Sequence, residues 1–227
     1  MNKLLTLLIS FFIITPVYSQ QTESKIGITL SNNYTRLEHL YRIEGEQLRP
    51  SYRIGVGFNG NFMLPKKWSF EFGFMYSLRG NDTYKKAINY GNMTNIDPSF
   101  PTHTNYSENY EFIDVPIKIF KNFNTDKKVG QFVNVGLIPS INIKYSVKRT
   151  TYYEDKKVYE YFQPENKLKN INALFHIGYG INFKLFKNIS AQIELHGKRS
   201  MMNVHTKESK LQNYFWETGL STSIYWR

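Results

Sequence analysis

The chain has 227 residues, a formal net charge of +11 at pH 7 and no cysteine. The length fits one domain, and the lack of cysteine excludes disulfides, thiolate metal sites, a cysteine nucleophile and a cysteine-linked lipid anchor. The positive charge suits either nucleic acid or anionic lipid. Because the chain begins with an export signal and contains no run of five or more Lys and Arg, we expect no nucleic-acid partner.

Residues 1–19 have the features of a secretory signal peptide. A positively charged start is followed by the apolar run 4–14, and we expect cleavage between Ser19 and Gln20. The apolar run is too short for a spanning helix, which favours a cleaved signal over an anchor. We therefore predict a signal peptide at 1–19 and one mature domain at 20–227.

Apolar and polar residues alternate along most of the remaining chain, with the period of two that is typical of a β-strand. The alternating segments are residues 25–34, 52–64, 68–78, 111–120, 131–145, 171–185, 188–197 and 214–226. The segment 171–185 is about twice as long as an ordinary globular strand, and this length suits a tilted strand that crosses a bilayer.

The connections between these segments alternate in length. Residues 65–67, 121–130 and 186–187 form the shorter connections, whereas the longer ones are residues 35–51, 79–110, 146–170 and 198–213. Short turns on one side and long loops on the other are typical of outer-membrane barrels. The sequence therefore predicts an all-β fold, a transmembrane antiparallel up-and-down β-barrel of about eight strands, with both termini on the periplasmic side.

Alternation alone does not decide which row of side chains faces outward, and a soluble lipocalin-like barrel would place the apolar row inside. The polar row is rich in Gly, Ser and Asn, which suits a narrow barrel interior. Aromatic residues mark the ends of the strands and predict two membrane-interface girdles. They are Trp68, Phe120, Phe186 and Trp226 near the short turns, and Tyr34, Tyr52, Tyr76, Tyr145 and Trp216 near the long loops.

Several motifs together resemble the small outer-membrane barrels described as porin-family or PorT-like proteins. They are Tyr18-Ser19-Gln20-Gln21, Lys25-Ile26-Gly27-Ile28, the segment 110–118 (YEFIDVPIK) and the segment 175–181 (FHIGYGI). The resemblance implies an outer-membrane location and no catalytic residues, and some members of the family serve protein secretion. One departure is that Arg227 follows Trp226, whereas such barrels often end on an aromatic residue.

The polar row carries a candidate interior cluster made of His176, Glu194, His196, Lys198 and Glu217. Buried charges need partners, so we expect these residues to form a salt-bridge network that stiffens the barrel. Two histidines beside a carboxylate suit a metal ion or acid–base chemistry on an acyl group as alternatives. We nevertheless predict no catalytic residue, no cofactor and no metal.

The longer connections contain tyrosines mixed with Lys and Arg. We select Tyr84, Tyr152, Tyr153, Tyr159 and Tyr161 as interaction candidates, because aromatic faces beside cations suit sugars, phosphates or a protein partner. The sequence thus predicts a non-enzymatic surface protein that contacts outer-membrane lipid, lipopolysaccharide and envelope or secretion proteins. The alternatives are a PorT-like secretion accessory, a lipid-modifying enzyme and a narrow pore.

Overall fold

The computed structural model describes residues 24–39, 46–86, 100–123, 128–163, 169–204 and 213–227. The predicted signal peptide lies outside the described residues. The strands are β1 (Ser24–His39), β2 (Glu46–Leu64), β3 (Trp68–Lys86), β4 (His103–Asp114), β5 (Ile117–Phe123), β6 (Val129–Tyr152), β7 (Lys157–Phe162), β8 (Ile171–Lys184), β9 (Ile189–Ser200) and β10 (Asn213–Trp226). A single 3-10 turn among the described residues, η2 (Pro65–Lys67), joins β2 to β3.

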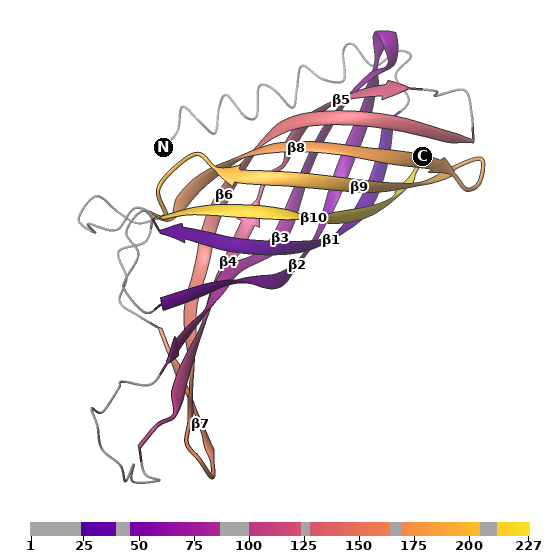
Figure 1. Ribbon diagram of the computed structural model, residues 1–227. Helices are drawn as coiled ribbons and strands as arrows, with labels where there is room; N and C mark the ends of the chain where they lie inside the picture. The colour runs from indigo at the N-terminus through magenta and orange to yellow at the C-terminus, as the bar shows by residue number, and fades with distance from the viewer. Residues whose placement is uncertain (1–23, 40–45, 87–99, 124–127, 164–168, 205–212) are drawn as a thin grey trace.

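All ten strands belong to one antiparallel sheet that closes on itself (Figure 1). β1 pairs with β2 on one side and with β10 on the other, so the first and last strands seal the ring. β4 and β5 share one position between β3 and β6, which gives a ring of eight strands. The predicted eight-stranded antiparallel barrel is confirmed.

β4 and β5 are one strand that is interrupted at a proline. Asp114 faces Met75 on β3 and Ile117 faces Phe72, so the register does not change across the gap. Pro116 has no N–H to donate, but its carbonyl oxygen still accepts a hydrogen bond from the Gly73 amide at 3.2 Å. The barrel wall therefore remains closed at this point.

The apolar row faces outward, as the sequence predicted for a membrane barrel. Ile26, Phe58 and Ile171 are 70%, 67% and 63% exposed, and their row continues along every strand of the ring. A wall of exposed Ile, Leu, Val and Phe is stable in lipid and not in water, which excludes the soluble alternative. None of the described residues forms a helix long and apolar enough to cross a membrane, and this finding does not bear on spanning by strands.

Two residues assigned to the aromatic girdles point into the barrel instead. Phe120 is fully buried against Phe132, because it belongs to the inward-facing row of β5. Tyr145 stacks on the buried Tyr110 at a centroid distance of 4.4 Å. An extra residue in β6, where the register against β4 shifts beside Glu111, reverses the faces of the strand beyond it.

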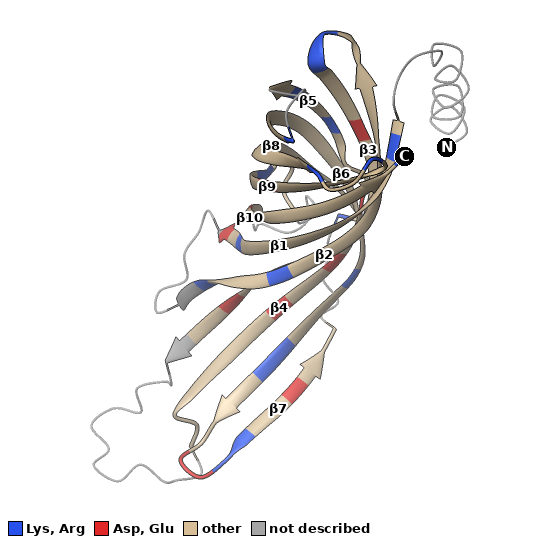
Figure 2. Ribbon diagram, turned by 90° about the vertical axis from the view of Figure 1, so that its right-hand side faces the viewer, with Lys and Arg blue, Asp and Glu red and all other residues tan. Residues whose placement is uncertain are grey.

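The two ends of the barrel differ in shape. We name the end with η2 and the β8–β9 connection the turn end, and the opposite end the loop end. At the loop end, parts of five strands continue past the ring as an open sheet, which we name the arm (Figures 1 and 2). The arm comprises residues 46–50 of β2, 81–86 of β3, 103–109 of β4, 146–152 of β6 and all of β7.

The arm corrects the expectation of long irregular loops. Most of 79–86, 103–110 and 146–162 is strand, although these residues were assigned to connections. The strands continue because each pairs with a neighbour over its whole length, so the backbone hydrogen bonds are satisfied without the membrane.

Candidate functional site

The first ionic cluster in the barrel centres on Arg79. Its guanidinium donates to Asp114 at 2.6 Å and pairs with Glu217, which also accepts from Lys198 at 3.1 Å. Ser77 donates a further hydrogen bond to Asp114 at 2.6 Å. Arg79 and both carboxylates are buried, and four different strands contribute these residues. The cluster therefore ties together opposite parts of the wall.

A second cluster centres on Lys118. Its ammonium lies 3.1 Å from Glu71 and 3.4 Å from Glu194. Glu194 also contacts His176 Nε2 at 2.6 Å, and the Tyr225 hydroxyl donates to Glu71 at 2.6 Å. Each buried charge thus has an opposite charge and at least one further polar contact, which is the arrangement that burial requires.

The two predicted histidines lie together. The His176 and His196 rings stack with centroids 5.5 Å apart, as their positions on neighbouring strands β8 and β9 predicted. His196 bonds Asn33 at 2.8 Å and Ser221 at 3.2 Å, so it belongs to a hydroxyl and amide network and has no carboxylate partner. The predicted salt-bridge network is present, but it divides the five candidate residues among three separate sets of contacts.

The charged side chains of the interior mainly pair with one another. Among the described residues, no three His, Asp or Glu side chains are arranged to hold a metal ion. A cavity of about 20 Å³ lies beside Asp114, His176 and Lys198, with room for about one water molecule. A substrate acyl chain would not fit there.

Both ends of the interior are blocked by apolar side chains. Phe120 and Phe132 close the turn end, with ring centroids 5.3 Å apart. Toward the loop end lies a buried cluster composed of Leu37, Tyr110, Phe112, Ile138, Leu174, Val204 and Phe215. These rings and the ionic clusters occupy the described interior, which suits a narrow barrel filled by its own side chains.

Sequence reasoning missed Arg79 and Asp114 in the interior network. Arg79 was assigned to a loop because the alternation was followed only to Leu78, yet it continues on β3 with the inward row Ser77, Arg79 and Asn81. Asp114 lies on the inward row of β4 beside Phe112. A charged residue that continues the inward row of a strand is a signal that would have identified both.

The arm carries most of the predicted interaction tyrosines on one surface, which we name the outer face. Tyr84, His103 and Tyr152 form a row across β3, β4 and β6, with centroid distances of 5.4 and 4.1 Å. Arg49 lies 5.3 Å from the Tyr84 ring at one end of this row, and Lys157 lies 5.2 Å from the Tyr152 ring at the other. The sequence indicated Tyr84 and Tyr152 as candidates, but it predicted neither His103 between them nor the sheet that aligns the three rings.

Two of the remaining candidates, Tyr159 and Tyr161, extend the same surface onto β7. Lys148 lies over both the Tyr159 ring, at 4.8 Å, and the Tyr161 ring, at 5.6 Å. Tyr153 follows β6 at the hairpin tip, with the Lys156 ammonium 5.3 Å from its ring. A cation is attracted to the face of an aromatic ring, so these lysines and tyrosines interact with one another without an ion pair.

The closed eight-stranded ring, the exposed apolar wall and the filled polar interior define an integral outer-membrane β-barrel. A family profile described as outer membrane protein beta-barrel domain matches residues 18–206, and the chain belongs to this family. No curated protein matches the chain. The protein is located in the outer membrane.

Several solved structures of outer-membrane proteins match the chain over most of its length. Neisserial surface protein A (NspA) is 6% identical with a TM-score of 0.45, over 87% of this chain and 95% of that one. OprG from Pseudomonas aeruginosa is 6% identical with a TM-score of 0.41, over 91% and 98%. The protease OmpT from Escherichia coli is 9% identical with a TM-score of 0.37, over 92% and 97%. Similarity at this level carries no conclusion about activity.

Proposed function

We propose that this protein is a non-enzymatic surface-interaction barrel, in which the closed wall anchors the arm on the outside of the cell. The outward wall contacts outer-membrane lipid and lipopolysaccharide, and the arm contacts envelope or extracellular components. The observation that carries the proposal is the contrast between an interior filled with side chains and a five-stranded sheet that extends beyond the ring with exposed aromatic and basic residues on its outer face. A filled barrel supplies neither a transport path nor a substrate pocket, whereas an ordered exposed sheet supplies a binding surface.

The experiment compares a deletion strain with strains that carry the full-length protein or a trimmed one. In the trimmed protein, Asn-Gly replaces residues 149–160, so that Lys148 and Tyr161 flank a two-residue hairpin turn. We expect the full-length protein, and not the trimmed one, to restore attachment of the cells to one another and to a solid surface. A heat-dependent shift on SDS gels verifies that the trimmed barrel still closes.

Full restoration by the trimmed protein would contradict the proposal. Loss of exported proteins from the medium of the deletion strain, restored equally by both versions, would instead identify a secretion accessory. A changed acyl composition of the lipopolysaccharide in the deletion strain would identify a lipid-modifying enzyme. Replacing His176 and His196 by Asn should leave that composition unchanged.

A further inference from the structure

The two faces of the arm differ in how their charges are neutralised. On the face that continues the barrel interior, Arg149 forms an ion pair with Glu160, and this hydrogen bond raises the pKa of Arg149. On the outer face, Lys148 and Lys157 have aromatic rings beside them and no described carboxylate within ion-pair distance. Asp82 lies on the same face opposite Arg49 and pairs with Arg53 at 3.9 Å, so the uncompensated positive charge of the outer face is that of Lys148 and Lys157.

The positive charges and the rings of the outer face alternate in space. The row Arg49, Tyr84, His103, Tyr152 and Lys157 crosses β2, β3, β4, β6 and β7 in that order. With strands about 4.8 Å apart, the row is roughly 19 Å long. Tyr161 and Tyr159 on β7 lie next to this row and are 72% and 55% exposed. The Lys148 ammonium, from β6, lies over both rings. A linear ligand with polar rings and anionic groups would match both the length and the alternation.

The outer face is also continuous with the lipid-facing wall. On β3, Tyr84 belongs to the same row as Phe74 and Tyr76, which are 55% and 37% exposed in the wall. Tyr84 lies eight residues beyond Tyr76, which is about 27 Å along the strand and roughly 20 Å above the membrane interface at a tilt near 40°. At this height, the outer face of the arm lies beside the sugars and phosphates of neighbouring glycolipids, above the level of their acyl chains.

We propose that the outer face of the arm binds the phosphorylated saccharide of outer-leaflet glycolipid. The exposed tyrosine rings lie against sugar faces, and Arg49, Lys148 and Lys157 bind phosphate or carboxylate groups. The inference rests on the proposed function and assigns a partner and a set of residues to the arm. The protein would then be held in place among its neighbouring lipids by its surface sheet as well as by its apolar wall.

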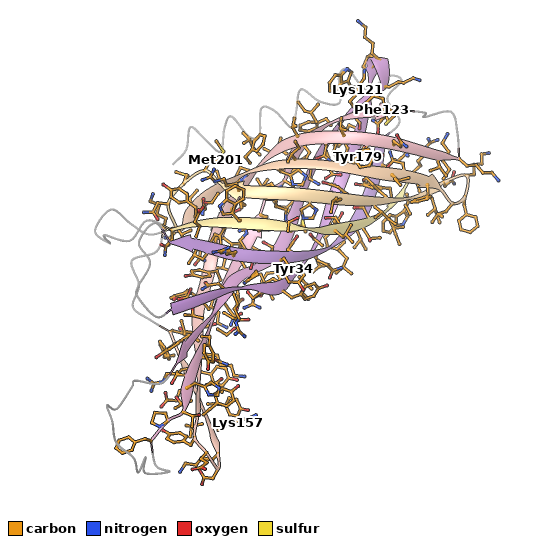
Figure 3. The ribbon with its side chains drawn as sticks, in the orientation of Figure 1. Tyr34, Lys121, Phe123, Lys157, Tyr179 and Met201 are labelled. Carbon is orange, nitrogen blue, oxygen red and sulfur yellow. The ribbon has the colours of Figure 1, made fainter. Side chains whose placement is uncertain are left out.

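The test uses full-length protein in nanodiscs of zwitterionic phospholipid and, as probe, the phosphorylated core oligosaccharide released from lipopolysaccharide. The variant K148Q/K157Q removes two charges from the outer face. The matched control K66Q/K121Q removes two charges at the turn end, where Lys121 lies over the Trp68 ring at 4.7 Å in the same kind of pair. Figure 3 shows Lys157 on the arm and Lys121 at the opposite end of the barrel.

We expect calorimetric titration to show oligosaccharide binding to the wild type and to the control, and binding weaker by roughly tenfold or more for K148Q/K157Q. Raising the salt concentration or removing the phosphates should weaken wild-type binding in the same direction. Equal binding by K148Q/K157Q and the wild type would overturn the proposal. Binding of dextran sulfate but not of the core oligosaccharide would also overturn it, in favour of a polyanion from outside the membrane.

The two proposals fail separately. If the trimmed protein fails to restore attachment while K148Q/K157Q binds the oligosaccharide normally, the arm is functional and only its assigned ligand is wrong. If oligosaccharide binding depends on both lysines while the trimmed protein restores attachment fully, the site exists and the surface-interaction function is wrong. A heat-dependent gel shift shared by all variants verifies that each compared barrel is closed.

Discussion

Strands β3, β4 and β6 each pass through two regions, the barrel and the arm, and the comparison shows what alternation means in each. In the barrel, one row of side chains faces lipid and the other forms the ionic clusters, so each row has a fixed chemical character. In the arm, the outer face carries exposed rings and cations, whereas residues of the row that continues the barrel interior, such as Asn81, Thr83 and Val147, are buried, and the two faces also differ in which charges are paired. The same strand geometry thus provides closure in one region and a binding surface in the other.

The largest effect should come from breaking the ionic cluster in the barrel. Arg79→Met leaves Asp114 and Glu217 without the cation that both share, and we expect a loss of about 3–5 kcal/mol in unfolding free energy. Urea unfolding in detergent measures this loss. The control Lys144→Met removes a cation from the outer-wall pair with Glu111, where Lys144 is half exposed, and should cost about 1 kcal/mol or less. Equal losses of unfolding free energy for the two variants would mean that the buried ion pairs stabilise the barrel no more than the exposed pair does.

A second prediction compares an inward with an outward leucine of the barrel. Leu174 is fully buried in the apolar cluster, and Leu174→Ala should cost about 2–5 kcal/mol because it loses contacts and leaves a cavity. Leu195 is 57% exposed on the wall, so Leu195→Ala should cost less, since lipid or detergent fills the gap. The same urea series measures both variants. A larger cost at Leu195 would contradict the assignment of inner and outer rows.

The junction between the regions gives a third prediction. Gly80 has a φ of 157°, and a Cβ there would overlap the carbonyl oxygen of Glu108. Its N–H donates to the Thr35 hydroxyl at 3.0 Å, and its carbonyl accepts from the same hydroxyl at 2.6 Å. We expect Gly80→Ala to cost about 1–3 kcal/mol, seen as a lower temperature for the heat-dependent gel shift.

The control for this junction is Gly197→Ala. A Cβ at Gly197 meets a single side-chain atom of Ile177 at 4.0 Å, so the substitution should leave the gel-shift temperature nearly unchanged. If both variants shift alike, the strand at Gly80 is not specially constrained and the arm does not depend on this junction.

The barrel was predictable from the sequence because its two environments impose a period of two on every strand. Errors arose where an extra residue reversed the faces. Tyr145 lies on the opposite side of the wall from the prediction because β6 contains one residue more than β4 beside Glu111. A bulge does not alter the amino-acid composition of a strand, and the residues on either side of it still alternate. Alternation alone therefore does not show where a bulge lies.

The sequence indicated interaction residues in the arm, but it did not predict the strands that carry them. The arm's tyrosines and lysines were identified, but neither row of these strands is consistently apolar, so no alternation of apolar and polar residues reveals the strands. β7 (Lys157–Phe162) is exposed at every position, and its pairing with β6 is a long-range property of the folded chain. The alignment of Tyr84, His103 and Tyr152 depends on that pairing, so the sequence indicated two of these rings but not their arrangement in one row.

The smallest effect should come from the ion pair on the arm. Arg149 and Glu160 are each nearly half exposed, so Glu160→Gln should destabilise the β6–β7 pairing by only about 0.2–1 kcal/mol. We expect amide hydrogen exchange in β7 to accelerate by roughly 1.4-fold to 5-fold, with no change in exchange of the barrel strands. Glu154→Gln, in the exposed turn after β6, makes the same charge change as a control and should leave β7 exchange unchanged. Accelerated exchange in β8 or β9 would show that the arm and the barrel open together, and the two regions would then be one cooperative unit.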